Sequence, residues 1–279
     1  MTTIFAHSPD GLRIAYDRAG SGPAVLLLHG GGSNREVWHE FGYVGRLSQD
    51  RTVITLDLRG HGESDLPTDP AEYTTDKMGG DILAVADACG IERFTIWGMS
   101  FGGKVGRYLA AQSDRVTKII IMGIPFGPAV TAEMRQQIEA FCTHWPPILA
   151  AQQEGTLDLD SLSENEREFM ESANVPVIMA WGQAMIDWPP MEPAELGCPA
   201  LWVVGSEDKA AMDSAREYGD ALQDSSVQLH IVQGLDHQQV LTEIDQVFPT
   251  MLAFTELGAR RVVPLRGRAG SGRRLLSTE

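Results

Sequence analysis

Short apolar runs recur along the chain, and they restrict its fold more than any other feature. Runs of this kind suit strands that are buried on both faces, as in a parallel sheet covered by helices. The expected strands lie at residues 25–28, 52–56, 94–97, 118–122, 200–204 and 227–232. Amphipathic helical patterns fall between them, at residues 76–89, 104–112, 212–222 and 239–257. The alternation predicts an α/β fold with a doubly wound, mostly parallel sheet flanked by helices.

The first part of the chain adds an antiparallel edge to this sheet. Strand patterns near residues 3–6 and 12–17 flank Ser8-Pro9-Asp10-Gly11, a sequence typical of a tight turn. With this hairpin the sheet has eight strands.

The alternation stops between Phe126 and Leu196, where helical patterns carry prolines, tryptophans and methionines. We interpret residues 127–195 as a helical lid inserted into an α/β core formed by residues 1–126 and 196–258. Ligands of open α/β sheets bind at the carboxyl ends of the strands, which is where such a lid would lie. Residues 259–279 are rich in Arg, Gly and Ser without periodicity, which predicts a basic flexible tail.

The net charge of −16 excludes two classes of partner. Nucleic acids and anionic membranes both require positive potential on the protein, so neither is expected to bind. No apolar run approaches the ~18 residues of a membrane span, and no secretory signal is visible. The 3 cysteines are too few and too scattered for a disulfide framework or a zinc site, which favours a cytoplasmic protein. The oligomeric state, monomer or dimer, stays open.

The stretch Gly98-Met99-Ser100-Phe101-Gly102-Gly103-Lys104-Val105 allows two interpretations. A phosphate-binding loop needs Ser or Thr after Gly-Lys as a magnesium ligand, and Val105 cannot serve. The G-x-S-x-G pattern instead predicts a strained strand-to-helix turn that exposes Ser100 as a nucleophile, with small residues on both sides. Because an apolar run precedes it and a helical pattern follows it, we favour this second interpretation.

The partners of a nucleophilic serine can be sought at the ends of other strands. The loop His29-Gly30-Gly31-Gly32-Ser33-Asn34 could supply a second oxyanion donor beside the backbone of Phe101, and we choose Gly31. His237 follows the last strand and is our candidate base, whereas His29 and His61 in glycine-rich turns are expected to brace loops. Asp208 is the preferred acid, with Glu207 less well placed and Asp236 poorly positioned to reach the ring of His237.

With these motifs, residues 1–258 resemble the α/β-hydrolase family, specifically its lidded esterase- and lactonase-like members. The resemblance includes His29-Gly30-Gly31, the D-x-R-G-x-G-x-S segment at residues 57–64, Gly205-x-x-Asp208 and Gly234-x-x-His237. It implies a Ser100–Asp208–His237 triad. Family members that open epoxides or remove halide carry Asp at the nucleophile position, so Ser100 argues against those chemistries.

The expected activity is hydrolysis of carboxylic esters or lactones with small to medium apolar groups, without metal or cofactor. Perhydrolase or haloperoxidase-type activity, C–C bond hydrolysis and a slow ligand-binding role stay open as alternatives. Apolar residues near the motifs and in the lid are candidates for the substrate pocket. They are Met99, Phe101, Phe126, Trp145, Trp181 and Trp188.

Overall fold

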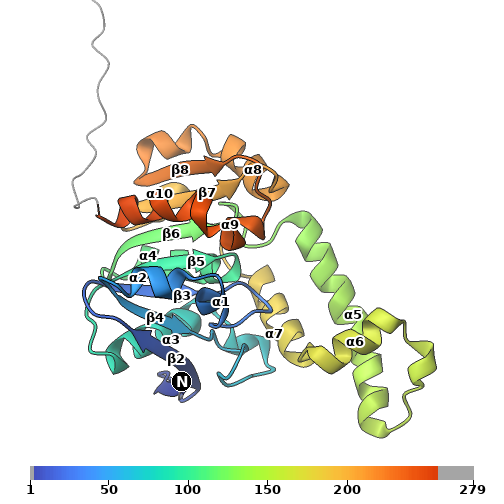
Figure 1. The fold of residues 1–279 in the computed structure, drawn as a ribbon. Helices are drawn as coiled ribbons and strands as arrows, with labels where there is room; N and C mark the ends of the chain where they lie inside the picture. Colours follow the sequence, from blue (N-terminus) through green and yellow to red (C-terminus); the bar gives the residue numbers. More distant parts are fainter. Residues whose placement is uncertain (1–2, 257–279) are drawn as a thin grey trace, which may run out of the picture.

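The computed structural model describes residues 3–256, which form one mixed sheet with helices on both faces (Figure 1). The sheet has eight strands in the order β1-β2-β4-β3-β5-β6-β7-β8. β2 runs antiparallel to both of its neighbours, and the strands from β3 to β8 pair in parallel. The strands are β1 (Ile4–His7), β2 (Arg13–Ala19), β3 (Ala24–Leu28), β4 (Thr52–Leu56), β5 (Phe94–Met99), β6 (Val116–Met122), β7 (Ala200–Gly205) and β8 (Val227–Val232).

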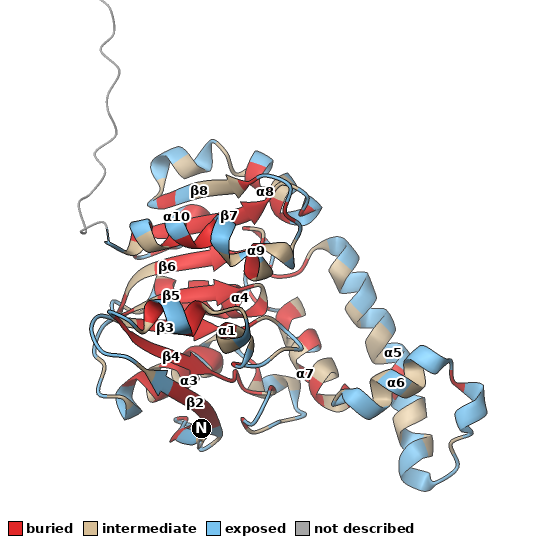
Figure 2. Cartoon of the chain, in the orientation of Figure 1, coloured by how far each residue is buried: buried red, intermediate tan, exposed pale blue. Residues whose placement is uncertain are grey.

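The helices divide between the two faces of this sheet. The apolar cluster on one face includes buried residues of α3 (Thr75–Ala88), α4 (Phe101–Gln112) and α8 (Lys209–Glu217). The cluster on the other face includes residues of four helices. These are α1 (Val37–Glu40), α2 (Tyr43–Leu47), α9 (Gln239–Thr242) and α10 (Ile244–Glu256). The central strands are buried on both sides, as their uninterrupted apolar runs predicted (Figure 2).

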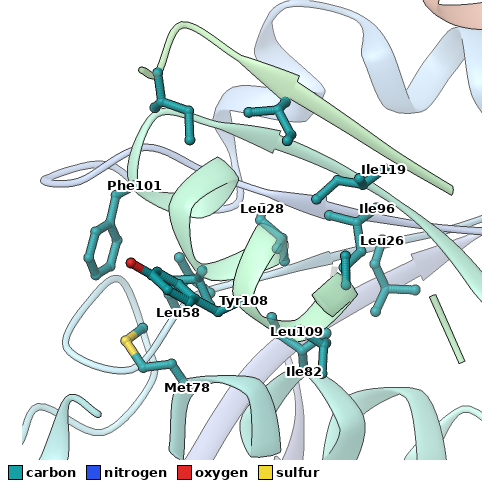
Figure 3. Packing of buried hydrophobic residues seen from close by; sticks show 14 of the residues in the cluster. Leu26, Leu28, Leu58, Met78, Ile82, Ile96, Phe101, Tyr108, Leu109 and Ile119 are labelled. Carbon is teal, nitrogen blue, oxygen red and sulfur yellow. The ribbon is translucent and has the colours of Figure 1, made fainter. Parts of the chain in front are cut away.

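The first cluster continues from the middle of the sheet to the serine turn. Leu28, Ile96 and Ile119 come from adjacent strands, and Leu109 of α4 belongs to the same cluster and lies beside Ile82 (Figure 3). Phe101, at the start of α4, belongs to the same cluster and lies near its edge in this view. The turn at Ser100 is therefore continuous with the hydrophobic core.

The predicted α/β sheet and its antiparallel edge are confirmed, and the differences lie at element ends. β5 extends to Met99 and α4 begins at Phe101, so Ser100 alone joins them. The helix expected over 239–257 is divided at Glu243, whose backbone leaves the helical region. The helix expected over 212–222 begins earlier and ends at Glu217, before a 3-10 turn, η4 (Ala221–Asp224).

Residues between β6 and β7 form a separate helical excursion. It contains α5 (Ala132–Glu154), η2 (Leu159–Ser161), α6 (Glu164–Ser172), α7 (Val175–Ile186) and η3 (Pro193–Glu195). α5 and α6 project away from the sheet, and α7 returns to pack against η1 (Pro70–Glu72) (Figure 1). The basic tail predicted at 259–279 lies outside the described residues.

A buried ion pair fastens the turn after β4 to α3. The guanidinium of Arg59 donates to both carboxylate oxygens of Asp81 at 2.6 Å, and both side chains are fully buried. Arg59 also contacts Asp10 of the β1–β2 turn. Because an uncompensated buried charge is costly, removing one partner should destabilise the fold more than removing a surface pair.

We therefore expect Asp81→Ala to lower the free energy of unfolding by about 3 kcal/mol in chemical denaturation. Asp87→Ala is the matched control on the same helix, because Asp87 is largely exposed and pairs with Arg115 at the surface. The control should change stability little. Equal effects of the two substitutions would contradict the assignment of Arg59–Asp81 as a structural ion pair.

Candidate active site

Ser100 occupies a sharp turn between β5 and α4. Its backbone has φ 48° and ψ −115°, and within residues 3–256 it is the only non-glycine residue with positive φ. A Cβ at Gly98 would lie 2.6 Å from the Cα of Gly103, and a Cβ at Gly102 would collide with the carbonyl of Leu28. The glycines of the motif are therefore required by close backbone contacts, as the elbow interpretation predicted.

The structure brings Ser100, His237 and Asp208 together. His237 Nε2 lies 3.1 Å from Ser100 Oγ, and its Nδ1 lies 2.9 Å from Asp208 Oδ2. The other oxygen of Asp208 accepts from the backbone N–H of Ala211, at the start of α8, which fixes the carboxylate. Asp208 is buried, while the His237 side chain is 38% exposed, so the ring is accessible from outside.

Glu207 and Asp236, the two alternatives to Asp208 as the partner of His237, are hydrogen-bonded to other groups. Glu207 is exposed and accepts from the hydroxyl of Ser206. Asp236 accepts from the backbone N–H groups of Gln238 and Gln239, in the turn that leads into α9. Asp208 is therefore the acid that contacts His237.

The glycine loop after β3 lies directly against the serine turn. A Cβ at Gly30 would be 3.5 Å from Ser100 Cβ, and one at Gly31 would be 3.5 Å from Phe101 Cβ. Gly102 N–H donates to the carbonyl of His29 at 3.0 Å, which joins the two segments. Phe101 is the first residue of α4, so its N–H has no acceptor within the helix and sits at the positive end of the helix dipole.

A buried carboxylate holds the glycine loop, and the sequence motifs had given it no such role. Asp57, directly after β4, accepts from the backbone N–H of Arg35 at 2.7 Å, from the Arg35 guanidinium, and from Glu63 N–H at 2.9 Å. Arg35 also donates to Asp17 at 2.8 Å. The D-x-R-G-x-G-x-S motif contained Asp57, but no sequence signal pointed to Arg35 as its partner.

His29 braces the same loop, as expected. Its Nδ1 donates to the carbonyl of Gly30 at 2.8 Å, and its Nε2 accepts from the N–H of Leu58 at 3.0 Å. Burial lowers the pKa of His29 to about 3, so the ring is neutral at pH 7.

Lys104 has a structural environment unlike that of a phosphate-binding lysine. Its ammonium is buried and donates to the carbonyl of Ala129 at 2.6 Å. Burial lowers its pKa to about 7. One turn further along α4, Tyr108 donates to the carbonyl of Pro189. The helix that begins after Ser100 thus contacts both connections to the helical excursion.

Three of the candidate pocket residues besides Phe101 lie close to the site. The ring edge of Trp181 would be 3.4 Å from a Cβ at Gly31, and Trp188 stacks on Phe101 with centroids 5.8 Å apart. Met99 Cε approaches the Gly123 position, which also adjoins the ring of His237.

The ring contacts of Phe126 and Trp145 lie away from Ser100. Phe126 packs edge-on against Trp202 at 4.9 Å, under the connection that leaves β6. Trp145 packs with Phe141 and Phe169 in the projecting helices. Both aromatic side chains are used for local packing, which sequence could not distinguish from pocket lining.

An open groove of about 600 Å³ lies beside this region, between residues 70–75 and residues 183–189. Trp188 lines it, but Ser100, His237 and Asp208 do not. Within residues 3–256, no group of three or more His, Cys, Asp and Glu side chains is arranged to hold a metal ion. No helix in the same range combines the length and apolar composition needed to cross a membrane.

The depressed pKa of His29 predicts a pH-dependent stability. Between pH 6.5 and about 3 the unfolded chain binds a proton at this ring that the folded protein does not bind. The free energy of unfolding should therefore fall as pH is lowered from 7 towards 4. Denaturation at several pH values should show a shallower fall in His29→Asn than in the wild type. Identical pH profiles would contradict this prediction.

Comparisons with known proteins agree with the topology. A sequence profile of the alpha/beta hydrolase fold matches residues 23–142. An uncharacterized protein of Mycobacterium tuberculosis is 43% identical over 123 residues, which are 43% of this chain and 34% of that protein. Epoxide hydrolase 3 of Siraitia grosvenorii is 31% identical over 124 residues, 43% of this chain and 38% of that enzyme. The chain thus spans little more than a third of the length of these relatives.

A thermophilic esterase from Thermogutta terrifontis has a similar structure, with a TM-score of 0.68 and 22% sequence identity. The alignment covers 91% of this chain and 98% of the esterase. The profile match, the strand order and the structural likeness together identify the chain as a protein of the α/β-hydrolase fold.

Proposed function

We propose that this protein is a serine hydrolase that cleaves carboxylic esters or lactones through an acyl-enzyme on Ser100. The observation that carries the proposal is the position of His237, within 3.1 Å of Ser100 Oγ and 2.9 Å of Asp208 Oδ2. A histidine held between a hydroxyl and a buried carboxylate is the arrangement that activates a serine for attack on an acyl carbon.

In the first half of the reaction, His237 Nε2 accepts the proton of Ser100 as Oγ attacks the substrate carbonyl. The backbone N–H groups of Gly31 and Phe101 donate to the developing oxyanion. Asp208 accepts from Nδ1–H of His237, which keeps Nε2 free as a base and stabilises the imidazolium. His237 then returns the proton to the leaving alkoxide, and the alcohol departs.

In the second half, His237 accepts a proton from water, whose oxygen attacks the acyl carbon. Collapse of this second tetrahedral intermediate breaks the bond to Ser100 Oγ, which recovers its proton from His237. The carboxylic acid product leaves, and the triad is restored.

Some relatives are named for other chemistry, an epoxide hydrolase among them. Family members that open epoxides use an aspartate as nucleophile, and position 100 is serine. The choice of acyl transfer therefore rests on Ser100, because the likeness to the esterase from Thermogutta terrifontis supports the fold alone.

We also propose that residues 127–195 serve as a lid, with residues 1–126 and 196–258 as the core. The contact of Trp181 with the Gly31 loop supports this role, because α7 then covers the site from outside the sheet. Trp181, Trp188, Phe101 and Met99 would line an apolar acyl pocket.

Ser100→Ala should reduce hydrolysis of p-nitrophenyl acetate, butyrate and octanoate by at least about 10³-fold, because the acyl-enzyme can no longer form. Ser113→Ala, at the other end of α4, is the matched control and should retain wild-type rates. Hydrolysis that persists in Ser100→Ala would refute the proposed nucleophile. A wild type inactive on all three esters would favour a ligand-binding protein.

Trp181→Ala should shift the acyl preference towards longer chains, because it removes a large ring beside Gly31. We expect the kcat/KM ratio of octanoate to acetate to rise by about tenfold, roughly the effect of one methylene of added contact. Trp145→Phe is the control. Within residues 3–256, the ring contacts of Trp145 are all with residues of the projecting helices α5 and α6. An unchanged ratio in Trp181→Ala would argue that Trp181 does not limit the acyl pocket.

A further inference from the structure

His61 differs from the neighbouring loop histidine in one respect. The rings of His29 and His61 lie 5.1 Å apart and both are buried. His29 uses both of its ring nitrogens in hydrogen bonds to the backbone. His61 uses only Nδ1, which donates to the carbonyl of Arg59 at 3.1 Å. Its Nε2 is buried and has no hydrogen-bond partner in the described part of the chain.

The ring that carries this nitrogen packs beside the proposed active site. The ring of His61 lies 5.5 Å from that of Phe101 and 5.9 Å from that of Trp181. Phe101 supplies a proposed oxyanion donor, and Trp181 lies over Gly31, which supplies the other. By contrast, the unpartnered indole nitrogens of Trp38 and Trp97 lie in the apolar cluster on the opposite face of the sheet.

The hydrogen bond from Nδ1 to the carbonyl of Arg59 fixes the tautomer of His61, and so determines whether Nε2 donates or accepts. A carbonyl oxygen only accepts, so Nδ1 carries the proton and Nε2 presents a lone pair. Burial lowers the pKa of His61, so the ring stays neutral at pH 7 and Nε2 cannot act as a donor. A buried acceptor without a donor is unfavourable, and a ligand that donates to it would remove this cost.

We propose that His61 Nε2 accepts a hydrogen bond from the substrate, and that preferred esters or lactones carry a hydroxyl or N–H group close to the reacting carbonyl. This inference rests on the proposed function, since it names the substrate class of the same site. The indole of Trp181 is only partly buried and belongs to the proposed lid. Its displacement would open the path from the acyl pocket to His61.

The test measures binding, so that it does not depend on turnover. In the Ser100→Ala protein, calorimetry compares two pairs of nearly isosteric esters in which a hydroxyl replaces a methyl group. They are ethyl 3-hydroxybutanoate with ethyl 3-methylbutanoate, and ethyl mandelate with ethyl 2-phenylpropanoate. In at least one pair the hydroxylated ester should bind about tenfold more tightly, as expected for one recovered hydrogen bond.

Adding His61→Phe should abolish this preference, because the substitution keeps a ring and removes the acceptor. His230→Phe on β8 is the matched control and should leave the preference intact. Equal affinities within both pairs in Ser100→Ala would overturn the proposal, even if His61→Phe fails to fold. A preference that persists in His61→Phe, or no binding of any of the four esters, would also overturn it.

Failure of the proposed function has a different signature. In that case Ser100→Ala would leave the hydrolysis of p-nitrophenyl esters unchanged, whatever the outcome of the binding comparison.

Discussion

The buried carboxylate of Asp57 is the interaction on which the geometry of this site depends. It accepts hydrogen bonds from Arg35 and from the backbone N–H of Glu63, and so joins the loops that follow β3 and β4. One loop carries the proposed oxyanion donor, and the other carries His61. Since each hydrogen bond to a buried charge is stronger than one between neutral groups, a single side chain fixes two walls of the site. His29 reinforces the same junction, because it donates to the carbonyl of Gly30 and accepts from the N–H of Leu58.

The sheet and the sharp turn at Ser100 were predictable because their signals are local. A strand buried on both faces needs a continuous apolar run, and a turn with close backbone contacts needs glycine at Gly98 and Gly102. The positions of His237 and Asp208 beside Ser100 follow from a related constraint. Both residues lie in loops after parallel strands, β7 and β8, and the carboxyl ends of these strands lie at the same edge of the sheet as the end of β5, where Ser100 follows.

The remaining features depend on contacts that no local pattern encodes. Trp145 and Trp181 are equally apolar in the sequence, but only Trp181 lies on the helix that returns to the core. The pairing of Arg35 with Asp57 requires β3 and β4 to be neighbours, which a run of apolar residues does not specify. The different hydrogen bonding of His29 and His61 likewise follows from where adjacent carbonyl groups point.

The anchors of the helical excursion have a consequence for how such proteins diversify. Lys104 and Tyr108 hold its two connections through the backbone carbonyls of Ala129 and Pro189. Every amino acid has a backbone carbonyl, so these two hydrogen bonds do not require particular side chains at positions 129 and 189. The excursion could accumulate substitutions, or be exchanged for another of similar span, while the sheet and the turn at Ser100 kept their shape. The substrate range of proteins with this architecture can then evolve through changes in the helical excursion, independently of the reaction chemistry.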